Sequence, residues 1–118
     1  MTADHTSQEK VREGLTAALD RKASAVLVFN LTELTTMADY FVLSTASSDR
    51  QARAISDAIT ERIGPALSVE GLQNANWVLM DYGDVVFHIF QEDARRFYAL
   101  ERLWGDAENE TGRFAASS

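Results

Sequence analysis

Apolar residues recur at helical spacing in three stretches of the chain, at about residues 7–22, 48–64 and 93–105. The first stretch opens with a capping box, because Thr6 and Glu9 have the spacing at which each side chain bonds the other residue's backbone N–H. The second ends in a Gly-Pro pair, which closes a helix because glycine tolerates the left-handed backbone and proline cannot continue the helix. The pattern therefore predicts three helices.

Short runs of β-branched and aromatic residues lie between these stretches, and each has the length of a strand. The runs are Ala25–Phe29, Asp39–Ser44, Leu67–Val69, Trp77–Asp81 and Asp84–Phe90. The first two should pair antiparallel, the third is a short edge strand, and the last two form a hairpin. This order predicts the α/β class, with one domain over residues 7–105 and a mixed β-sheet of four to five strands flanked by helices. Residues 1–6 and the small, polar segment 106–118 are predicted to be disordered.

The hairpin has one apolar side and one mixed side if Tyr82 and Gly83 form its loop, since side chains alternate along a strand. In that register Asp81 faces Asp84 on the mixed side, which also carries Trp77. Like charges directly opposite destabilise a hairpin, and tyrosine is not favoured in a two-residue turn. A four-residue loop relieves both conflicts. Local rules are often broken at functional sites, so the hairpin is the first candidate for one.

Two interpretations of the mixed side remain open from spacing alone. An aromatic residue beside a carboxylate pair suits an anchor with an acidic rim, which would receive a lysine or arginine of a partner. The structural interpretation is that aspartate is common at turns, where it bonds nearby backbone N–H groups, and that Trp77 lies under a helix.

Charge favours a basic protein as the partner. The chain has 118 residues and a formal net charge of −7, which makes it a poor ligand for phosphate backbones. Opposite potentials steer association, although the charge can also serve solubility alone. The chain has no cysteine and no apolar run of membrane-spanning length, and its N-terminus lacks the pattern of a signal peptide. We expect a soluble cytoplasmic protein that does not bind membranes.

Candidate catalytic groups are few. Asp81 and Asp84 are a candidate metal-binding pair for nucleotidyl transfer, but the loop at residues 44–48 has neither glycine nor lysine to hold a phosphate. His88 has no serine in an elbow motif to activate. We therefore expect no catalysis, no cofactor and no metal site.

Several segments, in this order, resemble the ribosomal silencing factor family, also named RsfS or Iojap. They are Asp39–Leu43, Ser47–Gln51, Val69–Gly71, Trp77–Phe90 and Arg95–Trp104. The resemblance extends over roughly residues 8–107. One departure is Ala46, where the family often has a glycine.

The resemblance implies a translational repressor with a nucleotidyltransferase-like fold that lacks the catalytic set. Members of the family bind the large ribosomal subunit through a basic protein on its joining face, ribosomal protein uL-fourteen. Their bulk then blocks docking of the small subunit under nutrient limitation. The acidic charge of this chain agrees with a basic protein partner and with no direct readout of nucleic acid.

The resemblance also carries partner binding onto seven residues of this chain. The expected apolar anchors are Trp77 and Tyr82, and the expected partners of basic side chains are Asp81 and Asp84. The supporting residues are Asp39, His88 and Arg95. Two alternatives are a homodimeric α/β scaffold, with the mixed side as its contact, and a vestigial nucleotidyltransferase-like enzyme that binds metal and nucleotide near the hairpin.

Overall fold

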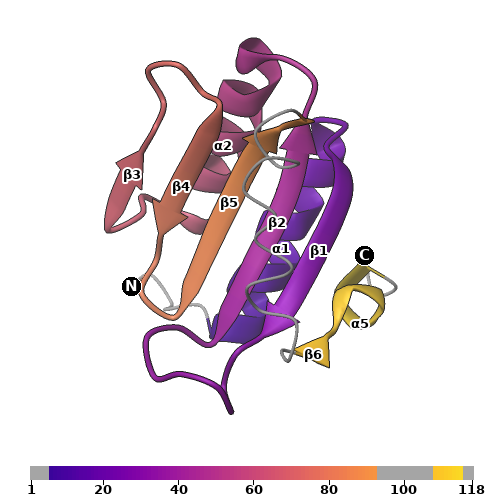
Figure 1. The fold of residues 1–118 in the computed structure, drawn as a ribbon, viewed down its shortest axis with the longest axis vertical. Coiled ribbons are helices and arrows are strands. Elements are labelled where there is room, and N and C mark those ends of the chain that lie inside the picture. Colours follow the sequence, from indigo (N-terminus) through magenta and orange to yellow (C-terminus); the bar gives the residue numbers. More distant parts are fainter. Residues whose placement is uncertain (1–5, 93–107, 116–118) are drawn as a thin grey trace.

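The structure is a computed structural model that describes residues 6–92 and 108–115. One sheet runs through it in the order β3-β4-β5-β2-β1-β6 (Figure 1). Its strands are β1 (Ser24–Asn30), β2 (Tyr40–Ala46), β3 (Ser68–Glu70), β4 (Trp77–Asp81), β5 (Val85–Gln91) and β6 (Glu108–Asn109). The helices are α1 (Ser7–Asp20), α2 (Asp49–Ile63) and α5 (Thr111–Ala115).

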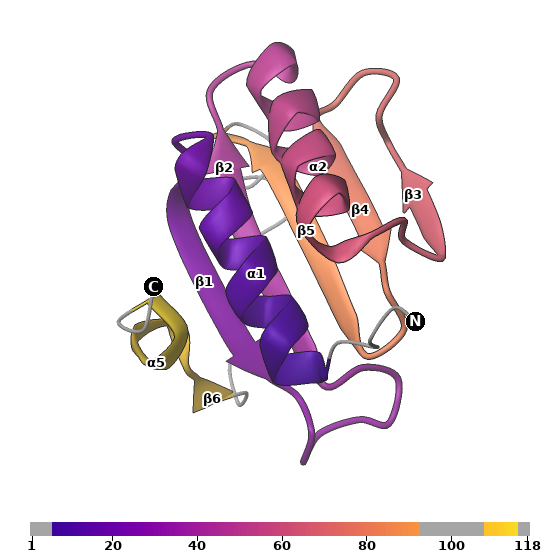
Figure 2. The same cartoon turned by 180° about the vertical axis from the view of Figure 1, so that it is seen from behind.

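The sheet is mixed, as predicted. β1 and β2 pair antiparallel, as do β3 with β4 and β4 with β5. β2 and β5 are parallel neighbours, with Tyr40 beside Val85 and Ala46 beside Gln91. The crossover between β2 and β5 contains α2, which packs on the sheet (Figure 2). The predicted α/β class is therefore confirmed.

Helices α1 and α2 lie side by side on one face of the sheet (Figure 2). The capping box at α1 is present, since the backbone N–H groups of Thr6 and Glu9 donate to each other's side chains at 2.8 and 3.1 Å. α1 can approach the sheet closely because Gly14 has no side chain. An ideal Cβ at this position would lie 2.1 Å from the ring of Phe87. This helix-covered face holds the larger of two hydrophobic clusters, which includes Phe87.

The register of the hairpin differs from the prediction by two residues. Asp81 pairs with Val86, not with Asp84. The backbone N–H of Tyr82 donates to the carbonyl of Val85 at 2.9 Å, so the loop is Gly83-Asp84. Gly83 has φ +90°, and glycine at the first loop position is typical of a type II′ turn. Neither conflict that motivated the functional interpretation is therefore present.

The two sides of the hairpin are nevertheless divided as predicted, because a shift of two residues keeps every side chain on its face. Val78, Met80, Val85, Phe87 and Ile89 belong to the helix-covered cluster. The opposite side carries Trp77, Leu79, Asp81, Val86, His88 and Phe90. We refer to the face of the sheet that includes these residues as the second face.

The prediction of a disordered tail from residue 106 is wrong for residues 108–115. Phe114 of α5 is fully buried and meets the ring of Tyr40 edge-on at 5.6 Å between centroids. The backbone N–H of Val28 donates to the hydroxyl of Thr111 at 2.8 Å, and the carbonyl of Val28 accepts from Glu110. One buried aromatic residue and two hydrogen bonds to Val28 thus hold a segment whose other residues are charged, polar or small.

The predicted third helix lies outside the described residues, as does Arg95. Within the described ranges, no helix is long and apolar enough to cross a membrane.

Candidate functional site

The second face is apolar at its centre. Phe29, Leu31, Ala38, Leu43 and Phe90 form a buried cluster there, separate from the core under α1 and α2. Half-buried apolar residues surround that cluster: Leu27, Phe41, Trp77 and Val86. Trp77 stacks on Phe90 with ring centroids 5.1 Å apart.

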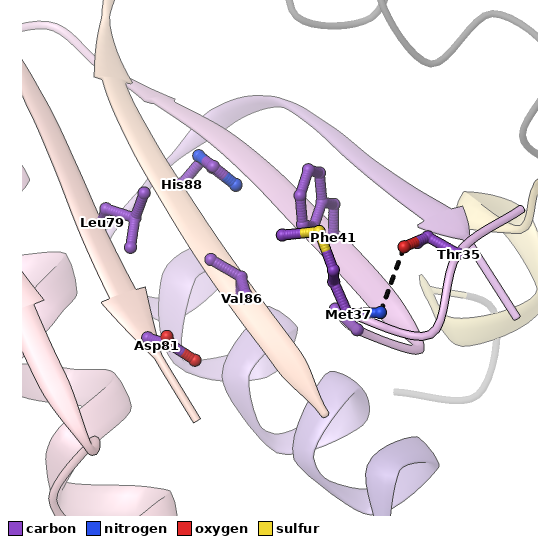
Figure 3. A pocket seen from close by; sticks show the side chains of 8 residues that line it. Thr35, Met37, Phe41, Leu79, Asp81, Val86 and His88 are labelled. Atoms are coloured by element: carbon purple, nitrogen blue, oxygen red, sulfur yellow. Dashed lines mark hydrogen bonds between the residues drawn. The ribbon is translucent and has the colours of Figure 1, made fainter. Parts of the chain in front are cut away.

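A pocket of about 220 Å³ opens on this face (Figure 3). Strands β2, β4 and β5 and the loop before β2 supply its lining, which consists of Thr35, Met37, Ala38, Phe41, Leu79, Asp81, Val86 and His88. Within the loop before β2, the backbone N–H of Met37 donates to the hydroxyl of Thr35 at 3.1 Å (Figure 3). The side chain of Met37 is 84% exposed.

His88 is a buried, ionisable residue of this face. Its side chain is only 3% exposed, and its Nδ1 accepts a hydrogen bond from the indole N–H of Trp77 at 3.1 Å. Its Nε2 has no hydrogen-bond partner among the described residues. Burial lowers the pKa of His88 to about 4, since desolvation disfavours the imidazolium. The ring is therefore neutral near pH 7, and the proton is on Nε2 because Nδ1 is an acceptor.

Three carboxylates gather where the hairpin turn meets the start of β2. The backbone carbonyl of Asp84 accepts from the N–H groups of Asp39 and Tyr40, at 2.7 and 3.1 Å. The side chain of Asp84 pairs with Lys10 of α1 at 2.8 Å. The side chain of Asp81 accepts from the backbone N–H of Gly83 at 2.7 Å, which stabilises the turn. Asp81 thus stabilises the turn, as the structural interpretation of the sequence predicted, and it also lines the pocket.

Tyr82 lies on the helix-covered side of the sheet. Its ring meets Phe87 edge-on at 5.6 Å, and its hydroxyl donates to the carbonyl of Gly64 at 2.7 Å. Burial raises the pKa of this hydroxyl, against a smaller lowering by a hydrogen bond with Thr60. This placement argues against Tyr82 as a direct anchor for a partner.

The structure brings together three of the seven predicted site residues at or beside the pocket: Trp77, Asp81 and His88. Asp39 and Asp84 lie at the hairpin turn, and Asp84 already has an internal partner. Met37 and Phe41 also line the pocket and were not among the predicted site residues. Met37 falls in a stretch without periodicity, and only its exposure in the structure reveals it.

Among the described residues, no group of three or more histidine and acidic side chains is placed to hold a metal ion.

The Lys10–Asp84 pair fastens the hairpin turn to α1, so Lys10→Met should destabilise the domain slightly. The two side chains are 20% and 31% exposed, which places the pair near the surface. We expect a loss of at most about 1 kcal/mol in the free energy of unfolding, because solvent screens such pairs. Urea unfolding measures it, with Lys22→Met at an exposed position as the control. A loss of several kcal/mol would contradict this assignment.

Comparison with known proteins identifies a family that this chain matches. The family model "Ribosomal silencing factor during starvation" matches residues 4–117. A ribosomal silencing factor of Halalkalibacterium halodurans is 37% identical over 106 residues, which is 86% of this chain and 91% of that protein. The factor of Bacillus subtilis is 41% identical over 92 residues, or 75% of this chain and 78% of that protein.

Solved structures agree with these matches. A crystal structure of a Chromobacterium violaceum protein superposes with a TM-score of 0.82 at 28% identity, covering 86% of this chain and 88% of that one. A structure from Bacillus halodurans gives a TM-score of 0.73 at 34% identity, with 83% and 95% coverage.

Proposed function

This chain belongs to the ribosomal silencing factor family, and we propose that it binds the large ribosomal subunit and keeps the small subunit from joining it. The observation that carries the proposal is the family match over residues 4–117. We further propose that the contact on the subunit is ribosomal protein uL-fourteen and that translation falls as a result under nutrient limitation. Family membership supports a silencing role at the ribosome. The identity of the partner protein and the block of subunit joining are what we propose in addition.

The second face and the adjoining hairpin turn are the surface proposed for this contact. Trp77 offers an apolar surface there, stacked on Phe90. Asp39 and Asp81 supply negative charge at the hairpin turn, at the other end of β4 from Trp77. The whole chain carries a net charge of −7. A surface with an aromatic centre and acidic rim suits a basic protein partner.

The proposed mechanism is steric and requires no bond chemistry. A bound domain that occupies the joining face of one subunit excludes the other, so silencing depends on the lifetime and the position of the complex. Relatives of the chain carry the names of silencing factors and not of enzymes. We therefore interpret the acidic hairpin as part of a binding surface and not as the site of a nucleotidyltransferase-like activity.

Light scattering of purified ribosomal subunits tests the proposal directly. Added protein should lower the scattering increase that follows mixing of the two subunits, and it should sediment with the large subunit alone. Prior incubation of the protein with the large subunit should give a stronger effect than late addition. Unchanged subunit joining at saturating protein would contradict the proposed function.

Charge reversal tests which surface is used. The double variant Asp39→Lys and Asp81→Lys should bind large subunits about tenfold more weakly, because opposed charges steer and hold a basic partner. Asp57→Lys with Glu61→Lys is the matched control, since both residues are exposed on α2 and give the same change in net charge. Asp84 is a poorer probe, because reversing it would place two lysines together at Lys10. Equal weakening by both double variants would remove the second face from the proposal.

A further inference from the structure

The end of the domain opposite the hairpin turn carries positive charge, where α1 ends and α2 begins (top of Figure 2). Three cationic side chains lie there and all are exposed: Arg21, Lys22 and Arg50. Gln51 joins the two segments, because its side-chain amide donates to the backbone carbonyls of Arg21 and Lys22 at 2.9 and 3.0 Å. The three cations therefore belong to one surface, which we call the basic end.

The three cations of the basic end have no carboxylate partner among the residues that the structure describes. The carboxylates next to them in the sequence are Asp20 and Asp49, and these pair with Arg62 at 3.6 Å and Arg53 at 3.3 Å. Glu92 is also exposed at this end, after β5, but β2 lies between β5 and β1. The positive charge is therefore not neutralised by an ion pair within the basic end.

The acidic hairpin turn lies too far away to cancel this charge. β2 begins at Tyr40 beside the turn and ends at Ala46 next to the basic end. Its 7 residues span about 23 Å, at about 3.3 Å per residue. Exposed charges farther apart than the Debye length, about 8 Å at physiological ionic strength, are largely screened from each other. The net charge of −7 therefore does not describe what a partner meets at the basic end.

Lys22 also occupies a backbone conformation that a lysine does not favour. Its φ is +65°, in the left-handed region, at the position just after a helix where glycine is the usual residue. Ala25, three residues further on, has φ +48°. The side chain of Lys22 is exposed, so burial does not offset the strain at this residue. A strained backbone at an exposed cation suggests that the cation has a function.

From these observations we propose that the basic end binds the phosphate backbone of RNA, as a second contact with the large ribosomal subunit. This inference rests on the proposed silencing function, because the ribosome supplies the RNA phosphates beside the bound domain. Arginine donates two parallel N–H groups to a phosphate, and lysine binds it as a point charge. Such contacts position a protein without reading bases. An anionic membrane is the weaker candidate, since its recognition usually takes about four to eight clustered cations.

A ¹H–¹⁵N NMR titration of the full chain with a short duplex RNA tests the basic end without the ribosome. At about 50 mM salt, the amides of residues 21–25 and 47–51 should shift saturably, whereas that of Gly83 in the hairpin turn should not. Vesicles of phosphatidylglycerol and phosphatidylcholine should leave all these amides unshifted. Absence of RNA-dependent shifts at the basic end, or shifts there with vesicles alone, would overturn the proposal.

Binding to large subunits at several salt concentrations tests the contact in place. Arg21→Gln with Arg50→Gln should bind about tenfold more weakly at about 50 mM salt, and the slope of log K against log salt should fall by about 1.5. Arg12→Gln with Arg62→Gln changes the net charge equally at other exposed helical positions and should keep the wild-type slope. Equal slopes in the two double variants would overturn the second contact alone. Absence of wild-type binding at every salt concentration would contradict the proposed function and the second contact together.

Lys22→Gly separates the cation from the fold. Glycine relieves the strain at φ +65°, so the urea midpoint of this variant should rise above that of the wild type. Its affinity for the duplex RNA should nevertheless fall several-fold, because one phosphate contact is lost. A more stable variant that binds RNA as tightly as the wild type would remove Lys22 from the proposed contact.

Discussion

Phe114→Ala should lower the free energy of unfolding by about 3–5 kcal/mol, the usual cost of removing a buried phenylalanine side chain. The ring is fully buried and meets Tyr40 of β2 edge-on, so its removal leaves a cavity lined by apolar groups. The same substitution should release β6 and α5 from the edge of β1, since Phe114 is the buried aromatic residue of that segment. Chemical denaturation measures the loss of stability, and hydrogen exchange at Val28 measures the release.

Gly112→Ala is the matched control in the same helix. A Cβ at Gly112 would meet nothing within 4 Å, so the substitution adds no clash. Alanine in place of glycine should stabilise a helix by about 0.5–1 kcal/mol, opposite in sign to the effect of Phe114→Ala. Equal stability of the wild type and Phe114→Ala would show that residues 108–115 are not part of the folded domain.

The C-terminal segment was predicted from its composition, whereas the helices and strands were predicted from the spacing of apolar residues. Only the second kind of signal carries information about position in the fold. The helices and central strands are encoded by repeated apolar positions, and their caps by residues such as Thr6 and Glu9, so these elements could be predicted. Segment 108–115 has a single large apolar residue and too few positions to establish a period. Its place beside β1 depends on tertiary contacts from Val28 and Tyr40, which lie far away in the sequence.

In the hairpin, the alternation of side chains determines which face each residue is on, whereas the turn determines the register of the two strands. Alternation assigned each side chain as far as Phe90 to a face, and the structure agrees for residues 77–81 and 85–90. The register depends on which residues form the turn, and here Gly83 with its positive φ takes the first loop position. The conflict between Asp81 and Asp84 was a consequence of the wrong register. Local rules are satisfied at this turn, so functional significance rests on the family match and on the second face.

The candidate site was predictable in part for the same reason. Trp77, Asp81 and His88 share a face by alternation, and the sequence placed them together. Burial within that face could not be predicted, because it depends on β2 lying parallel to β5 and on the loop that contains Met37. His88 therefore changes from an expected contact for a partner to a buried residue with one satisfied and one unsatisfied nitrogen.

Acidification should destabilise the domain through His88 by about 3 kcal/mol between pH 7 and pH 4. Burial lowers the pKa of His88 in the folded state to about 4, from an ordinary value of 6.5. Between these values the unfolded chain binds a proton that the folded chain does not. The contribution to stability is therefore fully present above pH 6.5 and is lost as the pH falls toward 4.

The difference between the wild type and His88→Asn isolates this contribution, because other titrating groups affect both proteins alike. Asparagine can still accept from the indole of Trp77 through its side-chain oxygen, so the hydrogen bond at 3.1 Å has a replacement. The free energy of unfolding of the wild type should fall more steeply with decreasing pH than that of His88→Asn, as measured by urea unfolding at several pH values. In NMR spectra, the His88 ring should remain in its neutral, Nε2-protonated form at pH 6. Titration of His88 near pH 6.5, or parallel stability curves for the two proteins, would contradict a buried neutral imidazole beneath the second face.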